Sequence, residues 1–499
     1  MNEHQSTYRQ ITKATSLFGG VQVFQIIITI IKSKFVAILL GPFGMGIVGL
    51  LSSTTGLITE LTNFGLGTSA VRDISEANGT QDEKRISTVI TVMRRLVWLT
   101  GLLGAGITLI FSPLLSQMTF GNKEYTAAFV WLSITLLLNQ LSSGQLVLLQ
   151  GLRKLQDLAK ANVLGSLIGL IITVPLYYLL GVRGIVPVII ITSIISLIFS
   201  WYYSRKIKIE KVVITRKLLS QEGRSMVVMG FMISLTGLIS VALSYLIRIY
   251  ITRIGSVAET GFYTAGFAII NTYVAMIFRA FDSDFYPRLA AIAKDNKLSR
   301  HTINQQTEIA ILILAPILIL FIVFVKWAII ILYSREFLTI YGMLQWAALG
   351  VFFRTVSWAI AIMLLAKGES KVFFWNEVIG NSYTFALAIG GYYFWGLTGI
   401  GFTYMLSYLI YMIQVFILTK IKYGFSFTSS FSKIFAVQLG LALICSLLTN
   451  ITKEPFSYIA GVILLAASTW YSYRTLNNFI NIRELIQDFK IKIRKKKGL

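Results

Sequence analysis

The chain is 499 residues long, of which 55% are hydrophobic and 13% charged, and its formal net charge is +24. Soluble domains carry about 25% charged residues, so this composition excludes a soluble globular protein and indicates a polytopic membrane protein. The positive charge does not indicate nucleic-acid binding, because the bases fall mostly in short loops between apolar runs.

Fourteen apolar runs approach or exceed the length of about 20 residues that a membrane-spanning helix needs. We predict an all-α protein with a transmembrane helix at each of 14–40, 43–70, 89–111, 125–148, 159–180, 185–203, 226–251, 260–281, 307–325, 338–365, 372–394, 397–419, 434–450 and 456–473. We expect no cleavable signal peptide, because the first run is longer than an h-region of about 7–15 residues.

The distribution of Lys and Arg predicts the topology. With the N-terminus placed inside, and with Lys160 at the start of the fifth span counted in the inner segment before it, 32 of the 45 basic residues fall on inner segments, six on outer loops and seven within the spans. Cytoplasmic loops carry an excess of bases, so both termini are predicted to be cytoplasmic.

The longest basic loop divides the chain after the sixth predicted helix. From this division we predict an N-terminal lobe of six helices (1–203), a basic connector (204–225) and a C-terminal lobe of six helices (226–419). Two extra helices (420–473) and a basic amphipathic tail (474–499) follow.

A spacing near the start of the chain recurs about 214 residues later. Lys34 lies seven residues before Gly41, and Arg248 lies seven residues before Gly255, in both cases at the end of an odd-numbered span. Both copies begin on the inner side, so the correspondence predicts parallel repeats related by an axis along the membrane normal.

Charges within apolar spans are candidates for function, because they usually face a bundle interior or a water-filled path. Lys34, Arg248 and Arg354 are the best candidates to line a central basic cavity, although Lys34 could instead extend along its flexible stem to the surface. A basic cavity in a bilayer suits an anionic, phosphate-bearing substrate, because Lys and Arg form charge-assisted hydrogen bonds with phosphate.

Two further intramembrane charges have competing interpretations. Arg279 is a candidate substrate-binding residue, but it is also close enough to Asp282 to pair with it along one helical face. Glu60 is a candidate for coupling transport to an ion gradient, or it pairs with a nearby base. Lys32 corresponds to Leu246 in the second repeat, so the repeat does not support a cavity role for it.

Signals for catalysis are absent from the sequence. It contains no G-x-x-x-x-G-K-[ST] motif, and its two histidines, His4 and His301, have no metal-ligand spacing. The outer loops are short and their acids lie one to a loop, without the positioned partners that acid–base chemistry needs. We therefore expect a protein that is not an enzyme, with no cofactor, no metal and no nucleic-acid partner.

Three stretches, LLGPFGMGIVGL, NFGLGTSAVRDI and DSDFYPRLAAI, together with the fourteen spans, resemble the O-antigen and polysaccharide translocases. These belong to the multidrug/oligosaccharidyl-lipid/polysaccharide exporter superfamily. The resemblance implies two six-helix lobes around a cationic central cavity. It also implies alternating-access flipping of undecaprenyl-pyrophosphate-linked oligosaccharide, such as an O-antigen repeat unit, across a bacterial cytoplasmic membrane. Membrane lipids and polysaccharide polymerase machinery are the further partners it implies.

Several alternatives remain open at this stage. Lipid II flippases also have fourteen helices, and a cation-coupled drug exporter would share the fold, although it would favour acids over bases in its cavity. A membrane-embedded glycan polymerase or ligase is opposed by the short outer loops. The sequence also leaves open a membrane scaffold without transport activity.

Overall fold

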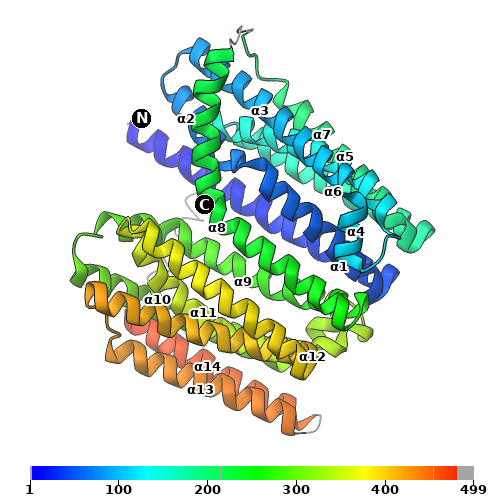
Figure 1. Ribbon diagram of the computed structural model, residues 1–499. Helices are drawn as coiled ribbons and strands as arrows, with labels where there is room; N and C mark the ends of the chain where they lie inside the picture. The colour runs from blue at the N-terminus through cyan, green and yellow to red at the C-terminus, as the bar shows by residue number, and fades with distance from the viewer. Residues whose placement is uncertain (1–2, 211, 213–215, 453–454, 480–499) are drawn as a thin grey trace, which may run out of the picture. The chain divides into compact units, whose positions relative to one another are not determined.

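A computed structural model describes residues 3–210, 212, 216–452 and 455–479, and the regular structure in these ranges is helical throughout (Figure 1). Nine segments within them are apolar and long enough to cross a membrane. Three of the nine, Val23–Asn63, Leu155–Ser204 and Ser370–Tyr423, each overlap two predicted spans. Twelve of the fourteen predicted spans fall on one helix or on half of a broken helix, so the predicted polytopic all-α fold is confirmed. The other two cross an element boundary: 43–70 runs past the end of α1 at Asn63 into α2, and 338–365 begins in η2.

The chain divides into two compact units. Unit 1 comprises Met1–Ala265 and Ile331–Phe337, and unit 2 comprises Gly266–Ile330 and Leu338–Leu499. The helices up to the start of α9 are α1 (Glu3–Asn63), α2 (Leu66–Gly79), α3 (Glu83–Ile110), α4 (Ser112–Phe120), α5 (Thr126–Gly151), α6 (Leu155–Leu180), η1 (Gly181–Gly184), α7 (Ile185–Ser204), α8 (Arg216–Ile254) and α9 (Val257–Ala291). The later helices are α10 (Asn296–Leu332), η2 (Arg335–Ile340), α11 (Tyr341–Ala366), α12 (Ser370–Tyr423), α13 (Ser429–Ile451) and α14 (Phe456–Phe479).

The first helix of unit 1 is broken in the middle. Gly41 has φ 64° and ψ −170°, a backbone conformation that side chains with a Cβ rarely adopt, and Pro42 follows it without a backbone N–H to donate. The break separates the two predicted spans 14–40 and 43–70.

The basic amphipathic tail predicted for 474–499 lies outside the described residues from position 480 onward.

Glycines let the second half of α1 approach α9 closely within unit 1. A Cβ atom added to Gly46 would lie 2.0 Å from the carbonyl oxygen of Val257, and one added to Gly261 would lie 1.9 Å from that of Pro42. Real Cβ atoms are not found at such distances, so only glycine permits this backbone-to-backbone contact. We refer to these contacts as the Gly46–Gly261 seam.

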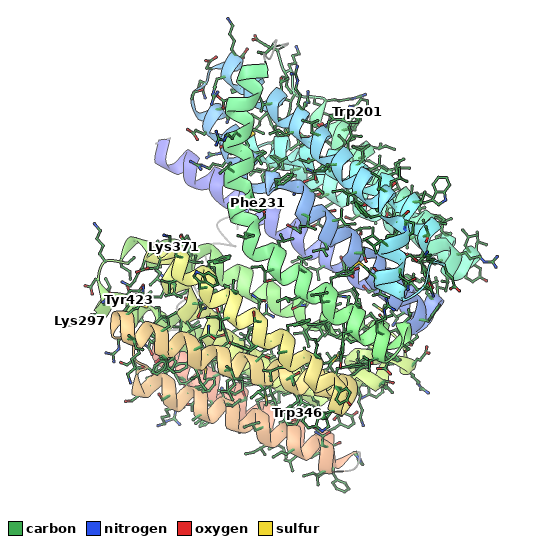
Figure 2. All side chains as sticks on the ribbon, viewed as in Figure 1. Trp201, Phe231, Lys297, Trp346, Lys371 and Tyr423 are labelled. Carbon is green, nitrogen blue, oxygen red and sulfur yellow. The ribbon has the colours of Figure 1, made fainter. Side chains whose placement is uncertain are left out.

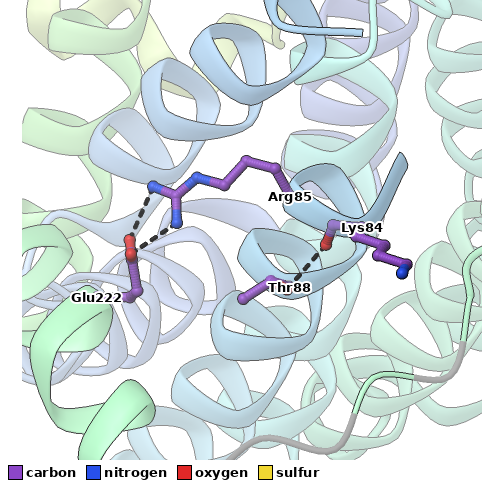
Figure 3. A network of polar contacts seen from close by, with 4 residues as sticks. All are labelled: Lys84, Arg85, Thr88 and Glu222. Atoms are coloured by element: carbon purple, nitrogen blue, oxygen red, sulfur yellow. Dashed lines mark hydrogen bonds and ion pairs between the residues drawn. The ribbon is translucent and has the colours of Figure 1, made fainter. Parts of the chain in front are cut away.

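An ion pair joins the first turn of α3 to the second turn of α8 in unit 1 (Figure 3). Arg85 donates from both terminal nitrogens to the two carboxylate oxygens of Glu222, at 2.6 and 3.1 Å. The two side chains are 44% and 26% exposed, so water screens their attraction.

We therefore expect Glu222→Gln to lower the free energy of unfolding by about 1 kcal/mol or less, because exposed pairs contribute little even in bidentate geometry. Thermal unfolding of the protein in detergent would measure the change. Glu210→Gln, which neutralises another exposed carboxylate in the preceding loop, is the matched control. A loss of several kcal/mol in Glu222→Gln alone would contradict the expectation.

Within unit 2, the connections before α10, before α12 and after α12 lie at one end. Lys367, after α11, donates to the side-chain oxygen of Asn296 at the start of α10, at 2.7 Å. Figure 2 shows Lys297 near the start of α10, and Lys371 and Tyr423 at the two ends of α12, at the same end of this unit. This is the arrangement expected when consecutive helices cross the membrane and return.

The last two helices form a hairpin with its own polar contacts. Gln438 of α13 donates to the hydroxyl of Ser472 on α14 at 2.8 Å and accepts a hydrogen bond from Ser468 at 2.6 Å, and all three residues are buried. Gln345 of α11 donates to Thr449 of α13 at 3.0 Å. The hairpin is thus joined internally and attached to the rest of unit 2 by hydrogen bonds.

Candidate functional site

Lys34 lies about two turns before the break in α1, within unit 1. Its Nζ donates a hydrogen bond of 2.6 Å to the carbonyl oxygen of Ile331, in the last turn of α10. The last carbonyls of a helix lack partners within that helix and carry partial negative charge, so a cation is favoured there. The ammonium of Lys34 is therefore held by a helix end, and the side chain is half-buried.

Arg248 lies in α8, also in unit 1. One of its terminal nitrogens donates to the carbonyl oxygen of Ser244 at 3.0 Å and to the hydroxyl of the same serine at 2.5 Å. The guanidinium carbon lies 5.4 Å from the centre of the Tyr263 ring, within range of a cation–π interaction. The Nε of Arg248 is buried and has no hydrogen-bond partner among the described residues, so it can still donate to a ligand.

Neighbouring contacts fix the part of α8 that carries Arg248. The hydroxyl of Tyr245 lies 2.8 Å from that of Thr119 in α4, which lies 3.2 Å from that of Thr54 in α1. Near the end of α8, Arg253 donates to the carbonyl oxygen of Met118 at 3.1 Å, close to the end of α4. These hydrogen bonds fix the position of Arg248 along α8 without involving the guanidinium nitrogens of Arg248 itself.

The two bases of the predicted repeat each precede an interruption of a helix, although their hydrogen-bond partners differ. Lys34 precedes a helix break at Gly41, and Arg248 precedes the end of α8 at Ile254, where Gly255 follows and α9 begins two residues later. Both bases belong to unit 1, and no described carboxylate lies within ion-pair distance of either.

Arg354 lies in α11, in unit 2. One terminal nitrogen donates to the hydroxyl of Tyr404 at 3.1 Å and is 3.5 Å from the side-chain oxygen of Asn271. The guanidinium carbon lies 5.5 Å from the centre of the Tyr408 ring. Tyr404 and Tyr408 are one turn apart on α12, so one face of that helix holds the arginine.

The remaining predicted residues are less informative. Arg279 is in α9, but its side chain lies outside the described ones. Glu60 is half-buried in α1, and no described residue forms a hydrogen bond or ion pair with it. A second intramembrane acid has defined partners: Tyr411 donates to the carboxylate of Glu377, and Asn376 donates to the hydroxyl of Tyr411 at 2.9 Å.

Sequence reasoning found the bases but not most of the residues that hold them. Ser244, four residues before Arg248, could have been identified from its spacing, because residues four apart share a helix face. Tyr263, Tyr404 and Tyr408 had no such signal, because they belong to other helices.

Lys34, Arg248 and Arg354 are positively charged side chains that carry hydrogen-bond donors inside a membrane protein. The neighbours of these bases are hydroxyls, carbonyls and aromatic rings, and no described carboxylate serves as the counter-ion of Lys34 or Arg248. Such a group favours an anion, since charged residues are costly in a bilayer unless paired or hydrated. Carboxylate, phosphate and pyrophosphate groups are the ligands that fit these donors.

The sequence matches a family of known proteins. A family model described as polysaccharide biosynthesis protein matches residues 35–341, more than half of the chain. The matched region contains Glu60, Arg248 and Arg279. A comparison with curated proteins finds no match.

Solved structures resemble the fold along most of its length. One is an inward-facing multidrug resistance transporter of the MATE family, assigned to the MOP superfamily. Its TM-score is 0.69 at 15% identity, and the match covers 82% of this chain and 96% of that one. Another is the lipid II flippase MurJ in an inward closed conformation, with a TM-score of 0.63 at 14% identity, covering 95% of this chain and 100% of that one. At these identities the likeness identifies the shared fold.

Proposed function

Because the chain belongs to the family of polysaccharide biosynthesis proteins, we propose that it is a flippase for a lipid-linked oligosaccharide. The substrate would be an undecaprenyl-pyrophosphate-linked repeat unit of an O-antigen or related surface polysaccharide. The fold shared with a MATE transporter and with MurJ supports a transporter rather than an enzyme.

The observation that carries the proposal is the setting of Lys34 and Arg248. Both are intramembrane bases of one unit, and no described carboxylate neutralises either. Two positive charges match the charge of a pyrophosphate, which accepts several charge-assisted hydrogen bonds. The apolar lipid tail of the substrate would remain in the bilayer while the pyrophosphate occupies these donors.

In the proposed mechanism, the two lobes alternate between states open to opposite sides of the membrane. Lys34 and Arg248 bind the pyrophosphate, with Arg354 and Arg279 as further substrate-binding residues. Glu60 couples the change of state to an ion gradient. We place the protein in a bacterial cytoplasmic membrane with both termini inside, which is where a substrate assembled on the inner leaflet would be available.

Lipid II flipping is the second candidate, supported by the match along the whole of the MurJ chain. Both substrates carry an undecaprenyl pyrophosphate, so the basic residues alone do not distinguish them. A cation-coupled drug exporter is disfavoured, because a positively charged drug would be repelled by Lys34 and Arg248.

A flipping assay would test the proposal. The purified full chain would be reconstituted in liposomes that contain either an undecaprenyl-pyrophosphate oligosaccharide or lipid II. A membrane-impermeant enzyme that modifies the sugar would report exposure on the far leaflet. We expect protein-dependent transfer of the oligosaccharide substrate at a rate at least tenfold above that of lipid II. Preferential transfer of lipid II, or of neither substrate, would contradict the proposal.

A further inference from the structure

Unit 1 contains a polar cavity that includes none of the proposed substrate-binding residues. It has a volume of about 250 Å³ and lies among α1, α5, α6 and α7. Its polar lining consists of Thr29, Lys32, Asn162, Ser166, Thr192 and Ser196. A cavity of this size and polarity can hold a small ion together with several waters.

Two glycines of α6 create the space. Gly165 and Gly169 line the cavity one turn apart, on the same helix face as Ser166 and Asn162. A Cβ atom added to Gly165 would have its nearest neighbour at 3.9 Å, and one added to Gly169 at 3.5 Å. The cavity is therefore open at these positions because side chains are missing there, not because the helices are separated.

Lys32 is the charged residue in this lining. Two residues before Lys34, it points about 200° around the helix from it, to nearly the opposite side of α1. No described residue forms a hydrogen bond or ion pair with the ammonium of Lys32, and no carboxylate lines the cavity. The positive charge thus lacks a protein counter-ion within the described residues.

The other polar groups divide into occupied and available donors. The hydroxyls of Thr29 and Thr192 donate to carbonyls of their own helices at 2.8 Å, and Ser196 lies 3.0 Å from the hydroxyl of Ser142. The Asn162 amide and the Ser166 hydroxyl have no hydrogen-bond partner among the described residues, which leaves their donors for a ligand.

We propose that this cavity binds a small free inorganic anion, of the class of chloride or phosphate, as the counter-ion of Lys32. An ammonium within a bilayer requires a partner of opposite charge or hydration, and the lining offers it no acid. The donors of Asn162 and Ser166 complete the coordination, and a cation is excluded by repulsion from Lys32. The site is separate from the proposed flipping activity, which it would support by stabilising the packing of α1 against α6 and α7.

Anion-dependent thermal stability tests the proposal. The full chain in zwitterionic lipid nanodiscs would be unfolded in sodium gluconate, with chloride or inorganic phosphate replacing gluconate at constant ionic strength. A ligand that binds the folded state alone raises the midpoint with the logarithm of its concentration. For a chain of this length we expect a rise of about 1–2 °C for each tenfold increase in anion above its Kd.

Two variants should abolish the response. Lys32→Met removes the charge, while Gly165→Val retains Lys32 and fills the cavity. Lys123→Met is the matched control, because it removes an exposed lysine that belongs to neither the cavity nor the proposed substrate site and should retain the response. A response of Lys32→Met equal to that of the unaltered protein would overturn the proposal. No response in the unaltered protein, or a response confined to anionic lipid, would do the same.

Discussion

A Lys34→Ala, Arg248→Ala double variant that inserts normally is expected to lose the ability to support surface polysaccharide. Each charge-assisted hydrogen bond contributes about 1.5–3 kcal/mol, so losing one from each base corresponds to about 3–6 kcal/mol. This is a reduction of roughly 10²–10⁴-fold in binding or transport. The measurement is complementation of a strain that lacks its flippase, with the rate of flipping in liposomes as the quantitative readout.

The control must distinguish an effect specific to Lys34 and Arg248 from the effect of losing any two positive charges. Lys123→Ala, Arg183→Ala removes the same number of bases from exposed positions on predicted outer loops and should retain activity. The conservative pair Lys34→Arg, Arg248→Lys keeps both charges and should retain a measurable part of it. Full activity in the alanine double variant, at equal membrane abundance, would refute the proposed pyrophosphate site.

Gly46→Val is expected to produce a large loss of stability in unit 1. Its Cβ would meet the carbonyl oxygen of Val257 at 2.0 Å, and a backbone atom cannot move aside by changing rotamer. Overpacking typically costs 1–3 kcal/mol, and a clash with backbone belongs at or above the upper end, about 3 kcal/mol. Thermal unfolding in detergent would measure the loss, together with the yield of inserted protein.

Gly56→Val is the matched control on the same half of α1. A Cβ at Gly56 has no heavy atom within 4 Å, so the same substitution should be tolerated with a change of about 0.5 kcal/mol or less. Equal stability of the two variants would mean that the Gly46–Gly261 seam does not contribute to the packing of α1 against α9.

The positions of the membrane helices could be predicted because the bilayer imposes a simple requirement. A span of about 20 apolar residues satisfies its own backbone hydrogen bonds only as a helix, so hydropathy alone identifies it. The short helix α2 was not predicted, because it is amphipathic: Leu66, Ala70 and Ile74 are buried on one face while its other face is polar. Its position depends on packing against α3, which hydropathy does not report.

The candidate site could be predicted only in part. A charge in an apolar run is visible in the sequence, and this identified Lys34, Arg248 and Arg354. Which face each base presents depends on helices remote in sequence, so the contact of Arg354 with Tyr404, fifty positions away, was not predictable. For the same reason Lys32 seemed uninformative, whereas the packing of α1 against α6 and α7 gives it a polar cavity of its own.

The hairpin of α13 and α14 has a consequence for biosynthesis. A membrane protein forms its helices before it packs them, and hydrogen bonds between helices are an important source of association once they are in lipid. Gln438 already bonds Ser468 and Ser472 across the hairpin, so these two helices can associate as soon as both have left the translocon. The hydrogen bond from Gln345 to Thr449 would then attach a preassembled pair to α11, as a late step in the maturation of unit 2.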